Sequence, residues 1–241
     1  MAERRHDDLA AYIRHICAGA ELETLFQPLV EFESNACLAY EALTRFPYAP
    51  EGSTGGWFRA AGDLGIGTML ELAAVAAALA HLDDVPADAA LAINISPGVA
   101  TTGEFFELVG PFAHRIIIEI TEHDPVEDYD VLAEQLQALR DLGARIAVDD
   151  VGAGFASLRH VLKLAPDIVK LDLSLTRGIA ESLGSRALTS ALVDFTGDTG
   201  ALITAEGIET VIELETLRKL GVDHGQGYLL GRPSSLKAHL N

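Results

Sequence analysis

The chain has 241 residues, 49% of them hydrophobic, and 36 acidic against 17 basic residues give it a formal charge of −19. This length and apolar content suit one large α/β domain, and the charge disfavours nucleic acid and anionic lipid as partners. The longest apolar stretch, residues 70–80, is interrupted only by Glu71 and is too short to span a membrane. With no secretory signal at the start and two cysteines without metal-binding spacing, we expect a cytoplasmic protein with free thiols.

The first part of the chain predicts a helix followed by two paired strands. Tyr12, Ile13 and Ile16 follow helical spacing, so we expect residues 1–20 to form a helix or connector and residues 21–241 to form the domain. Strands are expected over residues 24–32 and 37–46. The short segment between them cannot hold a parallel crossover, so the two strands should form an antiparallel hairpin. A long helical pattern, broken near residues 62–67, covers residues 57–82.

From residue 91 onward the pattern alternates between strand and helix. Strands are expected over 91–96, 115–121, 145–150, 168–173, 202–206 and 225–230, and helices within 97–109, 126–142, 155–164, 185–197 and 209–220. This alternation predicts a parallel sheet with helices outside it. About eight strands favour an α/β fold of the modified (β/α)8 TIM-barrel type, with an antiparallel first strand. An open doubly wound sheet is the alternative, but no dinucleotide-binding or phosphate-binding glycine motif supports it.

Polar residues stand at or near the C-terminal end of most predicted strands. A closed barrel brings these ends to one mouth, which is where such barrels carry out chemistry. Charged residues inside apolar strands are costly to bury unless they are paired or coordinated, and few basic residues are present to pair them. The residues concerned are Glu41, Asn94, Glu119, Glu122, Asp149, Asp150, Lys170, Asp172, Glu206, Glu209 and Gln226.

Several carboxylates and one amide form an all-oxygen ligand set, which suits Mg²⁺ or Mn²⁺ and not a zinc ion held by Cys or His. Two such ions a few ångströms apart are a common device for the attack of water on a phosphodiester. Taken alone, Asp149 and Asp150 before two glycines would equally fit a turn with solvated acids. An enolase-like enzyme acting on a carboxylate would also use strand-end acids and a lysine.

An ordered series of motifs resembles the EAL family of cyclic dimeric GMP phosphodiesterases. The series includes Glu41-Ala42-Leu43 followed by Arg45, and the likeness covers about residues 22–236. The other motifs, in the family's order, are FQP at residues 26–28, INIS, EITE, DDVGAGFASL, KLD, AEGIE and GQGYLLGRP. The resemblance implies a modified (β/α)8 barrel with an antiparallel first strand. It also implies hydrolysis of one phosphodiester bond of cyclic di-GMP to linear pGpG, as in bacterial second-messenger signalling.

The resemblance further implies roles for individual residues. Positions that hold a first Mg²⁺ or Mn²⁺ ion are matched by Glu41, Asn94, Glu119 and Asp149. A second ion, sharing Asp149, is matched by Asp150. Catalytic positions around the attacking water are matched by Lys170, Gln226 and Glu206, the last as general base. Positions that contact the dinucleotide are matched by Gln27, Leu43 and Arg45, and Arg45 matches a contact to phosphate. Asp172 matches a position beside the second metal or the substrate. The residue that anchors the glycine-rich loop is matched by Glu122, while Glu209 has no assigned role.

Two segments depart from the family's pattern. Val151 stands where the family usually has Phe, a change that could loosen the loop that orders Asp150, and residues 46–56 depart from the usual WxHP run. A catalytically weak or inactive receptor that binds cyclic di-GMP is therefore the alternative function. The resemblance also leads us to expect a homodimer formed through the glycine-rich loop and residues 155–164. Sensor or GGDEF domains in a longer parent protein would fit the family as well.

Overall fold

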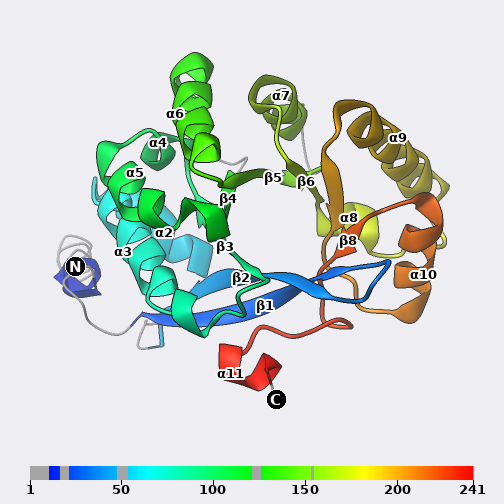
Figure 1. The fold of residues 1–241 in the computed structure, drawn as a ribbon, viewed down its shortest axis with the longest axis horizontal. Coiled ribbons are helices and arrows are strands. Elements are labelled where there is room, and N and C mark those ends of the chain that lie inside the picture. Colours follow the sequence, from blue (N-terminus) through cyan, green and yellow to red (C-terminus); the bar gives the residue numbers. More distant parts are fainter. Residues whose placement is uncertain (1–10, 17–21, 48–53, 121–125, 153–154, 241) are drawn as a thin grey trace, which may run out of the picture.

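The computed structural model describes residues 11–16, 22–47, 54–120, 126–152 and 155–240. Its strands form a closed barrel in sequence order, with helices around the outside (Figure 1). The strands are β1 (Glu23–Glu31), β2 (Cys37–Arg45), β3 (Ala90–Ile95), β4 (Ile116–Ile120), β5 (Arg145–Val151), β6 (Ile168–Leu171), β7 (Leu202–Ala205) and β8 (His224–Gly225). The predicted α/β barrel is confirmed.

The first strand runs against its two neighbours. β1 pairs antiparallel with both β2 and β8, while the pairs from β2 through β8 are parallel. A tight turn joins β1 to β2, and Asn35 adopts a left-handed conformation there with φ of 57°, which asparagine tolerates better than most residues. The predicted hairpin is therefore confirmed.

Helices cover the outer face of the barrel. Figure 1 shows them arranged around the strands, with the short α11 beneath β1. The α-helices are α2 (Thr54–Asp63), α3 (Gly67–Leu79), α4 (Pro97–Ala100), α5 (Gly103–Val109), α6 (Tyr129–Asp141), α7 (Phe155–Leu164), α8 (Leu173–Thr176), α9 (Leu183–Thr199), α10 (Val211–Leu220) and α11 (Leu236–His239). Two 3-10 turns, η1 (Leu82–Asp84) and η2 (Gly110–Arg115), precede β3 and β4. The break predicted near residues 62–67 is confirmed, since α2 and α3 are separate helices.

Two predicted strands end more than one residue earlier than expected. The strand expected over residues 225–230 is wrong beyond Gly225, because Gly227 has φ of 157° and a Cβ there would lie 2.2 Å from the backbone of Ile208. That close approach takes the chain out of the sheet and into a turn. The strand expected to reach Leu173 ends at Leu171 instead, because the Asp172 side chain accepts a hydrogen bond from Ser174 N and caps α8.

The barrel interior consists of an apolar layer below a polar one. Side chains in a strand alternate between the two faces, so residues two apart point the same way. The apolar layer is a buried cluster that includes Leu29, Ala39, Ala92, Ile117, Ala147 and Ile168. Each of these stands two positions from a polar residue of the predicted site, namely Gln27, Glu41, Asn94, Glu119, Asp149 and Lys170. In β1 the polar residue comes first, as its reversed direction requires. The strands therefore place these six polar residues at the same mouth of the barrel.

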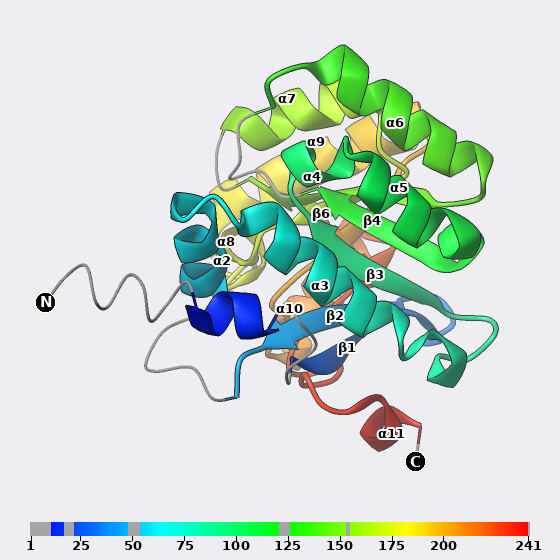
Figure 2. The ribbon, with the colours of Figure 1, turned by 90° about the vertical axis from the view of Figure 1, so that its left-hand side faces the viewer.

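Residues 11–16 are helical and pack beside α2, as Figure 2 shows in blue. Ile13 and Ile16 are buried in a separate apolar cluster with Trp57, Ala61 and Leu70. The helix predicted at the start of the chain therefore packs on the domain over these residues, and residues 1–10 and 17–20 lie outside the described ranges. None of the helices described is long and apolar enough to cross a membrane.

Candidate active site

Lys170 lies at the centre of the polar layer. Its Nζ is 2.7 Å from Glu206 Oε1, 2.8 Å from Glu119 Oε2, 3.3 Å from Asp149 Oδ1 and 3.7 Å from Glu41 Oε2. The lysine side chain is only 1% exposed. A single ammonium group therefore faces four carboxylates, three from other strands and one from just beyond β7, and one lysine cannot balance all four when they are ionised.

Three side-chain amides complete the polar layer. Asn94 Nδ2 donates to Glu41 Oε1 at 2.8 Å, and Gln226 Nε2 donates both to Glu41 and, at 3.0 Å, to Gln27 Oε1. Gln27 in turn donates from Nε2 to the carbonyl of Gly231 at 2.9 Å. The Oε1 atom of Gln226 is buried and has no hydrogen-bond partner among the described residues. A buried acceptor of this kind calls for a donor that the described residues do not supply.

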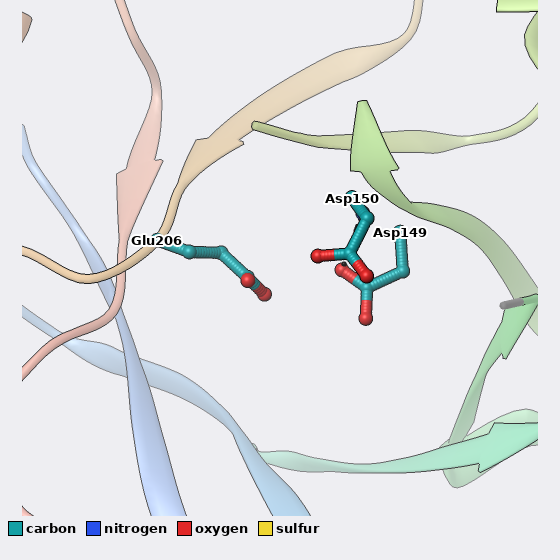
Figure 3. A group of neighbouring side chains, drawn as sticks. All are labelled: Asp149, Asp150 and Glu206. Carbon is teal, nitrogen blue, oxygen red and sulfur yellow. Dashed lines mark hydrogen bonds between the residues drawn. The ribbon is translucent and has the colours of Figure 1, made fainter. Parts of the chain in front are cut away.

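Asp149 and Asp150 end β5 in a strained turn. Asp150 has φ of 54°, which is unusual outside glycine, and its backbone N–H donates to Asp149 Oδ1 at 2.9 Å. Gly152 follows with φ of 113°. Figure 3 shows both aspartates facing Glu206, which extends towards them from the end of β7. One carboxylate oxygen from each of the three residues lies within 4.8 Å of the others, a spacing that could hold a metal ion.

The pKa values of the cluster reflect burial among like charges. Burial, reinforced by neighbouring carboxylates, raises the pKa of Glu119 and of Glu206 well above its ordinary range, and the pull of Lys170 does not offset this. Burial also acts to raise the pKa of Glu41, but Lys170 and hydrogen bonds from Gln226 and Asn94 outweigh it and lower that pKa. The carboxylates around Lys170 raise its pKa although burial opposes this. These shifts favour the charged form of Lys170 and the protonated forms of Glu119 and Glu206.

The donor set fits a hard divalent cation. Carboxylate and amide oxygens are the ligands that Mg²⁺ and Mn²⁺ take in proteins. Asn94 donates to Glu41 through its amide nitrogen, so its carbonyl oxygen is the atom left to serve as a ligand. Positive charge added beside Asp149, Asp150 and Glu206 would offset the repulsion among these carboxylates. The chemistry of the residues present thus agrees with the predicted two-metal site, whose individual ligands stay a prediction.

A cavity of about 330 Å³ opens between β2, β3, α2 and α3, and Asn94 is the residue of the polar layer that lines it. Its lining includes Leu43 and Arg45, both predicted to contact the dinucleotide, together with Asn94. Glu71 also lines it, and we did not predict a role for this residue. Its carboxylate accepts hydrogen bonds from Ser96 N at 2.8 Å and from Ser96 Oγ at 2.9 Å. The signal was present in the sequence, because Glu71 alone interrupts the apolar stretch of residues 70–80.

The other predicted residues lie in different places. Gln27 belongs to the buried amide group beside Glu41 and is absent from the cavity lining. Asp172 caps α8, and Glu209 forms an ion pair with Arg177 at 2.7 Å. Glu122 lies outside the described residues, so the proposed anchoring of the loop after Asp150 stays a prediction.

Comparison with known proteins agrees with this geometry. Residues 11–233 match the model of the EAL domain. A cyclic di-GMP phosphodiesterase from Pseudomonas aeruginosa is 33% identical over 150 residues, which are 59% of this chain and 26% of that protein. The chain spans less than a third of the length of the curated relatives it matches.

Two solved structures show the same fold at higher coverage. Klebsiella pneumoniae BlrP1 in complex with manganese and cyclic di-GMP is 30% identical, with a TM-score of 0.79 over 90% of this chain and 57% of that one. The PaMucR phosphodiesterase in complex with cyclic di-GMP is 26% identical, with a TM-score of 0.82 over 96% of this chain and 99% of that one. The chain therefore belongs to the EAL domain family of cyclic di-GMP phosphodiesterases.

Proposed function

We propose that this domain hydrolyses cyclic di-GMP to linear pGpG with the help of two Mg²⁺ or Mn²⁺ ions. The observation that carries the proposal is the arrangement of Asp149, Asp150 and Glu206 around shared space beside Lys170, at the mouth where barrels of this type act. Family membership and relatives that bind manganese and cyclic di-GMP support it.

Glu41, Asn94, Glu119 and Asp149 would hold the first ion, and Asp149 and Asp150 would hold the second. When bound, such ions supply positive charge that polarises the phosphodiester and favours the loss of a proton from water. Arg45 and Leu43, which line the adjacent cavity, would hold the dinucleotide, with the guanidinium of Arg45 facing a phosphate. Gln27 and Asp172 are proposed to contact the same dinucleotide.

Glu206 and Gln226 would position the attacking water. Glu206 accepts its proton, while the free Oε1 of Gln226 accepts its second hydrogen bond. The water oxygen forms a bond to phosphorus as the bond from phosphorus to the ribose 3′ oxygen breaks. That oxygen then takes up a proton, so one water molecule is consumed and the ring opens. Lys170 keeps Glu206 in place at 2.7 Å and offsets charge that develops on the phosphate.

A turnover assay tests this proposal. The protein is incubated with cyclic di-GMP and Mn²⁺ or Mg²⁺, and pGpG is quantified against the variant Glu41→Ala. Metal-dependent product well above the variant supports hydrolysis. Tight binding measured by calorimetry without any pGpG would instead identify a receptor, which is the alternative predicted from the sequence. Neither binding nor product would reject both functions.

The proposal extends to how the domain is assembled. We propose a cytoplasmic homodimer, formed through the glycine-rich loop and α7, within a protein that carries sensor or GGDEF domains. The relatives are several times longer than this chain, which supports the presence of further domains in such proteins. Light scattering at several concentrations tests the dimer, and a monomer at every concentration would contradict it.

A further inference from the structure

We infer that Glu213 is a positioning residue for the hydrolysis, because its carboxylate forms hydrogen bonds to both of the loops that follow β6 and β7. The first loop carries Asp172 and the second carries Glu206. This inference rests on the proposed function, and it concerns a residue that lies in α10, outside the carboxylate cluster.

Glu213 is 7% exposed and accepts three backbone hydrogen bonds. Its Oε2 accepts from Glu209 N at 3.0 Å and from Thr210 N at 2.9 Å, within the loop after β7. Its Oε1 accepts from Gly178 N at 3.0 Å, in the loop after β6. These charge-assisted hydrogen bonds are of the stronger kind, and together they join two segments that are separated by a full helix in the chain.

Helix capping accounts for only part of this arrangement. Thr210 and Glu213 form a capping box, in which the glutamate accepts from the backbone N–H of the cap residue. That motif needs the contact from Oε2 to Thr210 N. It does not need the contact from Oε1 to Gly178, which reaches into a different loop. The second oxygen therefore has a role that capping leaves unexplained.

Two further contacts join the same loops. Arg177 Nη2 lies 2.7 Å from Glu209 Oε1 in an exposed ion pair. Gly207 directly follows Glu206 and has φ of 66°, and a Cβ at this position would lie 2.8 Å from Leu173 Cβ. The backbone at Gly207 therefore packs against the Leu173 side chain beside Glu206, so a shift of one loop would move the other. Misplacing a reacting group by about 1 Å can cost about 100-fold in rate.

The decisive comparison is between Glu213→Ala and Thr210→Ala. The second variant removes the cap contact from Thr210 Oγ1 to Glu213 N but keeps the hydrogen bond between Glu213 and Gly178. Glu215→Ala, at an exposed position of the same helix, serves as the control. Each variant is measured for melting temperature, kcat and KM with cyclic di-GMP and Mn²⁺, Mn²⁺ affinity, and amide hydrogen exchange over residues 172–178 and 206–210.

We expect Glu213→Ala to speed exchange in both loops and to lower kcat by about 10-fold or more, with a much smaller change in KM. Thr210→Ala should lower the melting temperature while kcat stays within about 2-fold. Equal kcat losses in the two variants, or unchanged exchange over residues 172–178 in Glu213→Ala, would overturn the inference.

A second pair of variants tests the inference if Glu213→Ala fails to fold. Arg177→Ala and Glu209→Ala each remove the exposed ion pair between the loops, so the two variants should speed amide exchange in both loops to the same extent. Each should lower kcat less than Glu213→Ala does. If the wild type gives no pGpG, the proposed function fails. The exchange rates and Mn²⁺ affinities still decide whether Glu213 holds the two loops, so the two failures remain distinguishable. Unchanged exchange in every variant would end the inference.

Discussion

Lys170 Nζ lies 2.7 Å from Glu206 Oε1, although one residue points inward from β6 and the other stands just beyond the end of β7. The ion pair lies in the middle of an acidic site, so Lys170 balances part of the charge of the carboxylates around it. Removing it would leave buried carboxylates without their cation, which is among the most destabilising changes a folded protein can undergo.

Lys170→Met should lower the free energy of unfolding of the metal-free protein by about 3–5 kcal/mol. Mn²⁺ should restore part of that loss, because a divalent ion supplies the missing positive charge. Urea denaturation with and without Mn²⁺ measures both effects, and Lys219→Met at an exposed position is the control. A variant as stable as the control without metal would show that Lys170 does not neutralise the cluster.

Metal affinity should rise with pH. Burial raises the pKa of Glu119 and of Glu206 well above the ordinary value, so these groups hold protons that an incoming cation must displace. Calorimetric titration with Mn²⁺ in buffers of different ionisation enthalpy counts the protons released. Binding without proton release around neutral pH would contradict the raised pKa values.

The same groups set how stability depends on pH without metal. An acid whose pKa is raised on folding holds its proton in the folded state at pH values where the unfolded chain has lost it. The contribution of Glu119 and Glu206 to stability is therefore present below the ordinary glutamate pKa and is lost as pH rises through the raised values. Replacing each residue by Gln should flatten this fall, and an unchanged slope in denaturation experiments would count against it.

Gly152→Ala tests the turn that presents Asp150. Gly152 has φ of 113°, and a Cβ there would lie 2.3 Å from Leu175 Cδ1. We expect a loss of about 1–3 kcal/mol in unfolding free energy and weaker Mn²⁺ binding, because the turn must shift. Gly184→Ala is the matched control, since a Cβ at Gly184 meets nothing within 4 Å. Equal Mn²⁺ affinity in both variants would show that the conformation of this turn does not affect metal binding.

Arg45→Met tests the cavity as the binding place of the dinucleotide. Loss of one hydrogen bond to a charged group costs about 1.5–3 kcal/mol, which corresponds to roughly 10-fold to 150-fold weaker binding. Arg59→Met removes an exposed arginine from α2 and should leave affinity unchanged. Calorimetry with cyclic di-GMP makes the comparison, and the same dissociation constant for both variants would place the ligand elsewhere.

Local pattern was sufficient to predict the barrel and the polar layer. The short connection before Cys37 dictates the hairpin, and the polar residues at strand ends dictate a common mouth once the sheet closes. The ordered EAL motifs of the sequence argue against the enolase-like alternative, and the match to the EAL domain agrees with them. The capping of α10 has a signal in the sequence as well, since Thr210 and Glu213 have the spacing of a capping box.

Contacts between loops could not be predicted in the same way. The hydrogen bonds from Ser96 to Glu71 and from Gly178 to Glu213 join distant segments, and sequence spacing carries no signal for them. The early end of β8 depends on the approach of Gly227 to Ile208, which is likewise a tertiary contact. Sequence periodicity specifies which face of a helix or strand a side chain occupies, whereas these contacts depend on the positions of whole loops in the folded structure.

The reversed direction of β1 also decides where the chain enters the barrel. Glu23 pairs with Arg45, so β1 starts at the rim where β2 finishes. A segment joined ahead of β1 therefore reaches the rim that carries the carboxylate cluster, whereas an all-parallel barrel would receive it at the opposite end. Ile13 and Ile16, which are buried with Trp57, lie ahead of β1 in the chain. Under the proposed function, an upstream module would join the domain beside the substrate entrance.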